Sequence, residues 1–464
     1  MNAVRPDTAV ANDGSLYIAH QKVYPREVEG RFNRLRVAAT IALLGFFYGL
    51  PWLQWDGRQA VLFDLPARKF YILGLTFFPQ DFFLLTWLLI VAALSLFFFT
   101  ALAGRLWCGF ACPQTVWTEI FVWMERWTEG NRQKRMRLDS GAWSVEKVLR
   151  KSAKQVLWIS FALYTGYTFV GYFTPVRVLT DSVLTTMLGG WESFWILFYG
   201  FATYGNAGYM REQVCKYMCP YARFQGAMFD RDTLVISYDT KRGDPRGSRA
   251  RNVDPKSKGL GDCIDCKLCV QACPTGIDIR KGLQMECIAC AACIDACDSV
   301  MDKMNYPRGL VRYTTQNALD QSPTRVFRPR IIIYGSVLLA LIIGFGVAVA
   351  NRHLVEVDVL RDRNALYRRI DGDLIENVYT LRFINKDTRE HALRIEARGI
   401  DGVSVDTDRE LQKVGAGEVV STAVRIRAPS SAISGGRDIQ IVVSSDDGLI
   451  EAHSKARFIA PVSP

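Results

Sequence analysis

The chain has 464 residues, of which 49% are hydrophobic, and it carries a formal net charge of +11. This length predicts two or three domains. The apolar residues are gathered in long runs flanked by basic residues, which favours a membrane protein. The positive charge is therefore no evidence for nucleic acid binding, and membrane lipid is the expected partner.

Five apolar runs predict membrane-spanning helices, because a span needs roughly 17–25 mostly apolar residues. The runs cover 37–53, 82–104, 156–173, 191–209 and 331–350. The second and the fifth are the clearest. The other three are shorter or contain polar residues such as Glu192 and Asn206. For every run the alternative is a buried helix of a soluble domain.

Basic residues predict the orientation of these spans. Ten Lys or Arg lie in loop 105–154, against three in 54–81 and one in 174–190. The positive-inside rule therefore places 105–154 in the cytoplasm. No cleavable signal peptide is expected, because residues 1–36 are polar. The chain thus divides into a cytoplasmic tail 1–36, a four-span membrane domain 37–209, a cytoplasmic segment 210–330, a fifth transmembrane helix 331–350 and an extracytoplasmic domain 351–464.

Trp52 and Trp55 lie between the first two spans, where they are typical of an interfacial aromatic belt. A quinol or partner site in this loop is the alternative.

A Cys-x3-Cys-Pro motif follows both the second and the fourth span, and it contains Cys108 and Cys112 in one copy and Cys215 and Cys219 in the other. Positions i and i+4 share a helix face, so each pair can present two sulfurs together. The proline predicts that the second cysteine lies at a helix end or turn. Four thiolates suit Cu(I) or Zn. A third cluster and small packing residues are the alternatives, and we treat the four as a candidate copper site.

Eight cysteines between Cys263 and Cys297 form two runs of the pattern Cys-x2-Cys-x2-Cys-x3-Cys. This spacing predicts two [4Fe–4S] clusters, with the fourth cysteine of each run completing the other cluster. The first cluster takes Cys263, Cys266, Cys269 and Cys297, and the second takes Cys273, Cys287, Cys290 and Cys293. The ferredoxin-like module covers about 255–305.

Structural zinc and disulfides are the alternatives for these eight cysteines. Zinc ligands come in pairs separated by roughly 12–20 residues, and disulfides need an oxidising compartment. The triplets and the predicted cytoplasmic location favour iron–sulfur clusters. Pro274 follows the first run but Asp298 follows the second, so we expect the second turn to differ.

Residues beyond 350 alternate between apolar and polar, as in 355–360 and 393–398. About six or seven short strands predict an immunoglobulin-like β-sandwich without a disulfide, for which we expect a structural or protein-contact role. No histidine lies in a predicted span and no Cys-x-x-Cys-His motif is present, which excludes bis-histidine haem b in the membrane and covalent haem c. Nor is there a Walker A loop or a dinucleotide fingerprint. The electron donor is therefore an unidentified partner or a quinol.

Loop 55–60, both Cys-x3-Cys-Pro motifs, the eight-cysteine core and the β-domain together resemble the FixG/RdxA/CcoG family. These are membrane-bound ferredoxin-like accessory proteins of cbb3-type cytochrome oxidase. The resemblance implies a multi-pass protein of the bacterial inner membrane, with a periplasmic β-domain. It also implies a cupric reductase that delivers Cu(I) during oxidase assembly, with oxidase subunits or their copper-delivery proteins as partners.

Three functions follow. The first is a metalloreductase, in which the clusters reduce Cu(II). The copper is held near the four membrane-edge thiolates, which are those of Cys108, Cys112, Cys215 and Cys219. The second is a quinone-linked relay that passes electrons to a partner reductase, and copper is irrelevant to it. The third is a non-catalytic scaffold for oxidase assembly.

Overall fold

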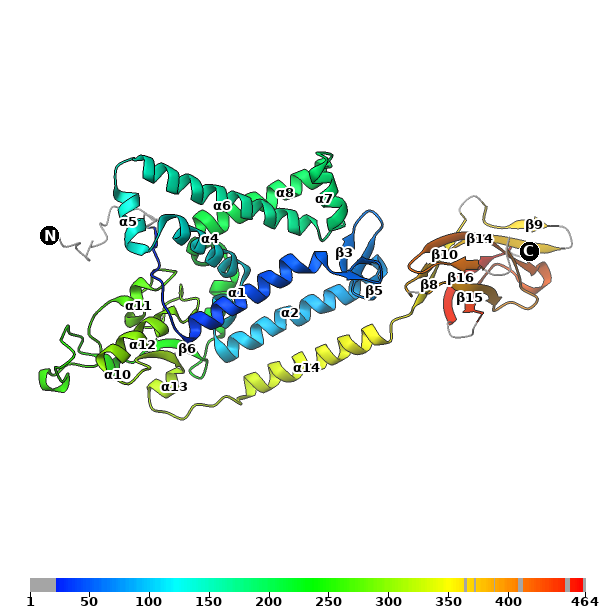
Figure 1. Ribbon diagram of the computed structural model, residues 1–464. Coiled ribbons are helices and arrows are strands. Elements are labelled where there is room, and N and C mark those ends of the chain that lie inside the picture. The colour runs from blue at the N-terminus through cyan, green and yellow to red at the C-terminus, as the bar shows by residue number, and fades with distance from the viewer. Residues whose placement is uncertain are drawn as a thin grey trace, which may run out of the picture. The chain divides into compact units, whose positions relative to one another are not determined.

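The computed structural model describes residues 22–362, 365–370, 373–387, 389–407, 412–446 and 451–461. Residues 1–21 of the predicted N-terminal tail lie outside this set. The chain forms two compact units, whose helices and strands are drawn in Figure 1. Unit 1 comprises Met1–Leu43, Phe99–Ala162 and Ala202–Arg328, and unit 2 comprises Leu44–Phe98, Leu163–Phe201 and Pro329–Pro464. The division falls inside the helices α1 (Arg31–Gly49), α2 (Phe82–Ala103), α6 (Val145–Val170) and α8 (Gly190–Thr203).

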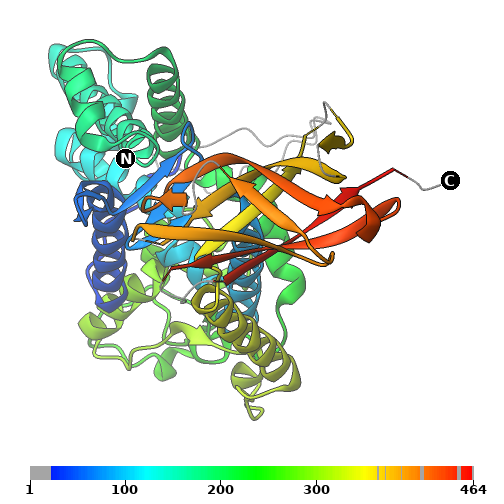
Figure 2. The same cartoon turned by 90° about the vertical axis from the view of Figure 1, so that its right-hand side faces the viewer.

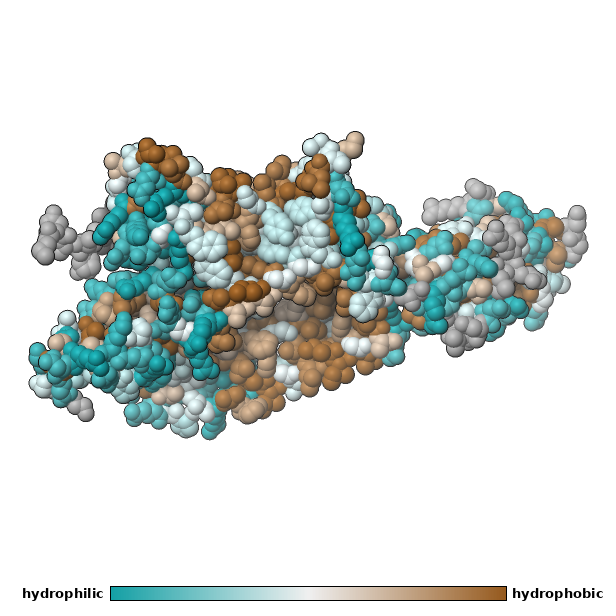
Figure 3. Space-filling model, in the orientation of Figure 1, coloured by the Kyte–Doolittle hydropathy of each residue, from teal (hydrophilic) through white to brown (hydrophobic). Residues whose placement is uncertain are grey.

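Three helical segments of the described residues are long and apolar enough to cross a membrane, and they cover Arg31–Trp52, Pro79–Ala103 and Pro329–Ala350. They correspond to the first, second and fifth predicted spans. On α14 (Pro329–Ala350) the side chains of Ile333, Leu339 and Ile343 are each more than half exposed. Figure 3 shows apolar side chains gathered over this helix. An exposed apolar face of this size is typical of contact with lipid.

The third and fourth predicted spans are helical but differ from these three. The first ten residues of α6 carry five charged side chains, from Glu146 to Lys154. α8 ends at Thr203, and the chain continues in π-helical turns at η3 (Tyr204–Met210) and η4 (Val214–Met218). π-Helical turns are rare in proteins, and those that occur are often found at functional sites.

Unit 1 contains the ferredoxin-like module and short helices around it. Its further elements are α3 (Leu106–Phe110), α4 (Pro113–Glu129), α5 (Arg132–Ser140), α9 (Pro220–Met228), β6 (Val235–Tyr238), α10 (Thr240–Gly243), η5 (Lys256–Lys258), α11 (Leu268–Gln271), η6 (Ile279–Lys281), α12 (Ala292–Met304), β7 (Val311–Thr314) and α13 (Gln316–Leu319). Strands β6 and β7 pair antiparallel and bring the two ends of the module together.

A buried carboxylate ties the helices of unit 1 together. Glu125 of α4 is fully buried. Its Oε2 lies 3.0 Å from Nη1 of Arg135 and 2.9 Å from Nη2 of Arg211. Although burial alone would raise the pKa of Glu125, Arg211 and Arg135 hold it below its usual value. These basic side chains therefore neutralise a buried charge, in addition to any part they take in membrane orientation.

In unit 2 a polar side chain fixes the loop that follows the first span. This loop contains η1 (Leu50–Trp52), β1 (Gln54–Trp55), β2 (Arg58–Gln59), β3 (Val61–Asp64), β4 (Lys69–Ile72) and β5 (Leu75–Phe77). Gln59 is buried, donates to the carbonyls of Val61 and Gly171, and accepts from the N–H of Val176 at the start of α7 (Val176–Leu184). Its amide thus has a structural role.

The C-terminal part of unit 2 is a β-sandwich. One antiparallel sheet contains β8 (Val355–Arg361), β9 (Arg368–Ile370), β10 (Leu374–Asn385), β12 (Ser404–Thr407) and β14 (Val419–Pro429), and the other contains β11 (His391–Arg398), β13 (Gln412–Val414), β15 (Gly436–Ser445) and β16 (Glu451–Ile459). Figure 2 shows the sheets packed face to face. Leu381 and Phe383 of β10 meet Ile441 of β15 and Phe458 of β16 in one fully buried core. The alternating pattern at 355–360 and 393–398 corresponds to β8 and β11.

A buried lysine joins this sandwich to the start of α2. Lys386 is 2% exposed, and its Nζ lies 2.5 Å from Oδ1 of Asp81 and 2.8 Å from Oε1 of Glu356. Asp81 lies in η2 (Pro79–Asp81) and is itself buried. Removing one partner of such a pair leaves an uncompensated charge in the interior.

The substitution Lys386→Met should therefore destabilise unit 2 by about 3 kcal/mol, because Asp81 and Glu356 lose their cation. We expect thermal melting of the detergent-solubilised chain, followed by the circular dichroism of its strands, to shift down by roughly 10 °C or more. Lys455→Met is the matched control, since Lys455 lies exposed on β16. Equal melting temperatures for the two variants would contradict the prediction.

Candidate functional site

The eight cysteines of the ferredoxin-like module line two small cavities. One is lined by Cys263, Cys266, Cys269 and Cys297. The other is lined by Cys273, Cys287, Cys290 and Cys293, and also by Cys269. The sets that the spacing predicts thus lie together. Each predicted set brings four cysteines to one cavity, which is the number of ligands that a [4Fe–4S] cluster needs.

Electrostatic coupling between the thiols shows the same grouping. Burial, followed by the neighbouring Cys269 and Cys263, raises the pKa of Cys297 to about 12. Burial likewise raises the pKa of Cys293 well above its ordinary value, and Cys290 and Cys287 contribute. Thiols in such surroundings lose their protons when they bind a metal.

Left-handed backbone turns shape both cysteine runs in the same way. In the first run Asp265 and Lys267, which flank Cys266, have φ of 56° and 58°. In the second run the two residues flanking Cys290, Ala289 and Ala291, have φ of 53° and 60°. Such angles are uncommon outside glycine. The repeated geometry curls each loop around its own cavity.

The two runs end differently, as Pro274 and Asp298 predict. The first run ends just after α11, and Cys273 is followed by a turn. The second continues in α12, which passes through Cys297 to Met304. Asp298 lies inside this helix, and its carboxylate accepts a hydrogen bond from the N–H of Gly309. A proline at this position would break α12.

Three side chains from outside the cysteine motif hold the loop of the second run. Arg36 of α1 donates to the carbonyl of Cys290 at 3.1 Å, and Arg105 donates to that of Cys287 at 3.2 Å. Tyr313 of β7 donates to the carbonyl of Ala289. Sequence reasoning missed all three. Arg36 is one of several basic residues that precede the first apolar run, and no local pattern marks any of the three as a contact of this loop.

The beginning of α1 is also bound to this module. Asp295 of α12 is buried and accepts from the N–H groups of Phe32 and Asn33, where the unpaired donors of a helix N-terminus lie. A Cβ on Gly30 would come within 2.3 Å of the Asp295 carboxyl. Glycine is therefore required for this close approach.

The two Cys-x3-Cys-Pro motifs have similar local structures. Cys108 lies in α3 and Cys215 in the turn η4. Cys112 and Cys219 are the N-cap residues of α4 and α9, with extended backbone and a proline at the first helical position. The sequence-based expectation for the second cysteine of each motif is met.

The two Cys-x3-Cys-Pro motifs come together in unit 1, although about 100 residues separate them in the chain. Burial, followed by the thiols of Cys112, Cys108 and Cys219, raises the pKa of Cys215 to about 12. Burial raises the pKa of Cys108 to about 11, against a hydrogen bond from Gln225 whose Nε2 lies 3.3 Å from Sγ. Among the described residues, no three His, Cys, Asp or Glu side chains are arranged to enclose a single metal ion, either in this group or among the ferredoxin thiols.

The membrane-edge thiols adjoin the second cysteine run. Cys108 and Cys215 pack against a buried cluster that contains Cys290 and Ala292. A Cβ on Gly109 would lie 2.8 Å from backbone atoms of Ala289 and Cys290. The first Cys-x3-Cys-Pro motif can therefore approach this loop only with glycine at position 109.

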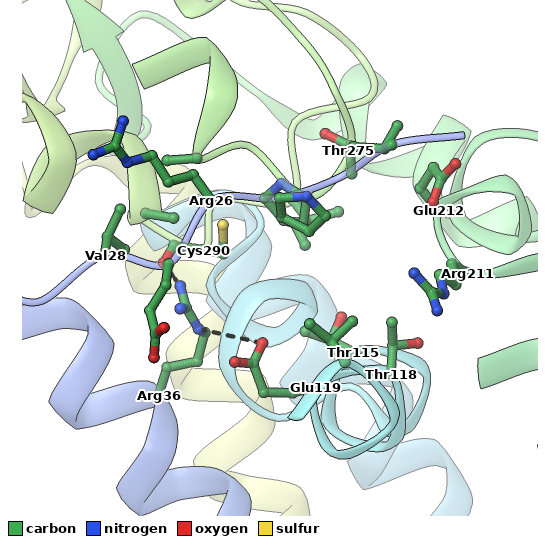
Figure 4. A pocket seen from close by; sticks show the side chains of 18 of the residues that line it. Arg26, Val28, Arg36, Thr115, Thr118, Glu119, Arg211, Glu212, Thr275 and Cys290 are labelled. Atoms are coloured by element: carbon green, nitrogen blue, oxygen red, sulfur yellow. Dashed lines mark hydrogen bonds and ion pairs between the residues drawn. The ribbon is translucent and has the colours of Figure 1, made fainter. Parts of the chain in front are cut away.

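A pocket is lined by residues of both groups of cysteines, and Figure 4 shows it from close by, with Cys290 on its wall. It is lined by Cys290 of the second run and Cys215 of the membrane-edge group, with Thr115, Thr118 and Glu119 of α4 on its wall. Further lining residues are charged and comprise Arg26, Glu27, Arg36, Arg126, Arg211 and Glu212. In Figure 4 the Arg36 side chain lies between the Cys290 carbonyl and the Glu119 carboxylate.

Comparison with protein-family models agrees with this description. Residues 83–134 match a 4Fe-4S binding domain and residues 210–316 a 4Fe-4S dicluster domain. Residues 345–461 match the IG-like fold at the C-terminal of FixG. With its thiol-lined cavities and apolar helices, the chain is an iron–sulfur electron-transfer protein associated with a membrane.

Similar proteins identify the family. The chain is 37% identical over 429 residues to "Nitrogen fixation protein FixG" of Rhizobium meliloti (strain 1021), covering 84% of this chain and 82% of that protein. It is 39% identical to "Protein RdxB" of Cereibacter sphaeroides, over 86% of this chain and 87% of the other, and 38% identical to "Protein RdxA" of the same organism, over 84% of each. The chain belongs to the FixG/RdxA family. A crystal structure of a FixG-related protein from Vibrio parahaemolyticus is 26% identical and covers 23% of this chain and 97% of its own, with a TM-score of 0.21.

The substitution Gly109→Ala should loosen the contact between α3 and the loop of the second run. The new Cβ would collide with backbone atoms, which cannot rotate away as a side chain can, so we expect a loss of about 1–3 kcal/mol in stability. Release of iron to a chelator should be faster than in wild type. Gly226→Ala is the matched control, because its Cβ would meet only Met285 Cε, at 3.6 Å. Equal rates of iron release would show that the close approach is not required.

Proposed function

We propose that this iron–sulfur protein reduces Cu(II) to Cu(I) during assembly of a cbb3-type cytochrome oxidase. The observation that carries the proposal is the pocket shared by Cys215 and Cys290. An ion that enters it lies beside a residue of the membrane-edge group and a residue of the ferredoxin-like module. The resemblance of the whole chain to the FixG/RdxA/CcoG accessory proteins supports the link to oxidase assembly and to its copper-delivery proteins.

The ferredoxin cysteines are the proposed ligands of two [4Fe–4S] clusters. Cys263, Cys266, Cys269 and Cys297 form one set, and Cys273, Cys287, Cys290 and Cys293 form the other. When bound, such clusters supply electrons one at a time. The chain's own part is to hold the second loop through Arg36, Arg105 and Tyr313 and to keep it dry, since Cys290 is 8% exposed.

Copper is the substrate in this proposal. Each Cu(II) takes up one electron and becomes Cu(I), while the reduced protein loses one electron, and no proton is needed. Cu(I) prefers soft thiolate ligands. On the sequence-based hypothesis Cys108, Cys112, Cys215 and Cys219 bind the copper directly.

The proposed orientation follows the distribution of basic residues. The module at about 255–305 lies in the cytoplasm and the β-domain, 351–464, in the periplasm. The regions 156–173 and 191–209 complete five spans of a multi-pass protein of the bacterial inner membrane. This orientation keeps the cysteines in the compartment where thiols remain reduced.

Paired substitutions test the ligand sets. Cys263→Ser should remove about four iron atoms per chain, the content of one cluster. Adding Cys297→Ser should remove no more iron, because both cysteines belong to one set. Adding Cys293→Ser in its place should remove about four more. Ser299→Ala, two residues beyond Cys297 on α12, is the control and should keep all of the iron. Loss of further iron in the Cys263/Cys297 double variant would contradict the crossed ligation.

Reoxidation by copper tests the proposed reaction. Dithionite-reduced, desalted protein should regain its absorbance near ~400 nm when Cu(II) is added without oxygen, and a Cu(I) chelator should report one Cu(I) per electron lost. Thr118→Trp should slow this reaction about tenfold or more by filling the pocket and displacing the ion. Thr128→Trp, on α4 but outside the pocket lining, is the control. If both variants react as fast as wild type, the pocket is not the site of reduction and the quinone-linked relay is favoured.

A further inference from the structure

We propose that Cys108, Cys112, Cys215 and Cys219 together hold a third [4Fe–4S] cluster. The inference rests on the iron–sulfur part of the proposed function and not on copper reduction. It replaces the hypothesis that these four thiolates are the copper ligands, and leaves Cu(II) to react in the adjoining pocket.

The distribution of cysteines over the matched domains is the first argument. Residues 83–134 match a 4Fe-4S binding domain, yet Cys108 and Cys112 are the only cysteines in that range of the sequence. Residues 210–316 match a dicluster domain and hold ten cysteines, of which the two ferredoxin clusters use eight. Cys215 and Cys219 are left over. Each cluster needs four thiolates, so two incomplete pairs make one complete ligand set.

Their placement in the fold is the second argument. The two pairs meet in unit 1, where Cys108 and Cys215 pack against the same buried cluster of Cys290 and Ala292. Each pair combines a cysteine within a helical turn with a cysteine that caps the next helix. Two copies of one motif, which are far apart in the sequence, thus lie close together in the fold.

The donors around the sulfurs are the third argument. In the second ferredoxin run the N–H of Ala289 donates to the thiol of Cys287, with 3.4 Å between N and Sγ. Gln225, fully buried, adds a side-chain donor to Cys108. Hydrogen bonds to the sulfurs are a means by which proteins tune iron–sulfur clusters.

Charge favours a cluster over a single copper ion. Four thiolates around one Cu(I) leave most of their negative charge uncompensated, and burying such charge is costly. A [4Fe–4S] core carries more positive charge and spreads the remainder over many atoms. The N-termini of α4 and α9 at Cys112 and Cys219 also favour negative charge.

The third ligand set also fits the use of the pocket. Because residue 109 is glycine, α3 packs directly against the backbone of Cys290. The membrane-edge cysteines and the second ferredoxin run are therefore in direct contact. The pocket opens to both, through Cys215 and Cys290. An ion held there is flanked by two electron-carrying sites.

Iron counting on the full-length protein tests this inference. Wild-type chain, reconstituted without oxygen with iron and sulfide, should hold about twelve iron atoms and as many acid-labile sulfides. The pair variants Cys108→Ser/Cys112→Ser and Cys215→Ser/Cys219→Ser should each hold about eight, and the quadruple variant should also hold about eight. Met218→Leu, beside Cys219, is the control and should keep about twelve. Mössbauer spectra should show the lost iron as one cubane.

Other results overturn the inference. About eight iron atoms in wild type, together with one Cu(I) per chain that the quadruple variant fails to bind, would assign the thiolates to copper. Iron losses of the two pair variants that add up in the quadruple variant would show that the pairs act separately. The wild-type count decides even if the variants do not fold. Twelve irons in a protein that does not reduce Cu(II) would refute the copper proposal alone.

Discussion

The backbone carbonyls of the second cysteine run are satisfied by side chains from outside the ferredoxin motif, and the thiol sites depend on this constraint. Left-handed turns at Ala289 and Ala291 curl the loop around its cavity. Carbonyls that are buried in this way need hydrogen-bond donors. Arg36, Arg105 and Tyr313 supply them from three separate elements. The ferredoxin-like module therefore packs against other elements of unit 1 and is not a separate domain.

This constraint also places the membrane-edge thiols. Arg105 precedes the first Cys-x3-Cys-Pro motif by three residues, so the side chain that holds the loop also positions Cys108 beside it. Gly109 then allows backbone contact. These contacts bring the membrane-edge cysteines against the second cysteine run. Cys215 and Cys290 therefore line one pocket.

Charged residues serve two purposes in this chain. The excess of Lys and Arg in loop 105–154 predicts which side of the membrane the loop occupies. Arg135 from the same loop is buried and neutralises Glu125, and Lys386 neutralises Asp81 in unit 2. A count of charges gives the orientation signal but cannot identify such pairs, because partners far apart in sequence meet only after folding. Buried pairs of this kind are costly to break.

Local pattern alone determined much of this protein. The spacing of the cysteines divided the eight ferredoxin cysteines into two sets, and the members of each set line one cavity together, with Cys269 also on the wall of the second cavity. Apolar length identified three helices that are long and apolar enough to cross a membrane, and the alternation beyond residue 350 identified the β-sandwich. Two further predicted spans, 156–173 and 191–209, are helical, but charge at the start of α6 and π-turns after α8 set them apart. Only the tertiary structure decided that the two Cys-x3-Cys-Pro motifs meet and that they adjoin the second cysteine run. The physical reason is that this meeting depends on long-range packing, such as a missing Cβ at Gly109 against the backbone of Cys290, which no local spacing encodes.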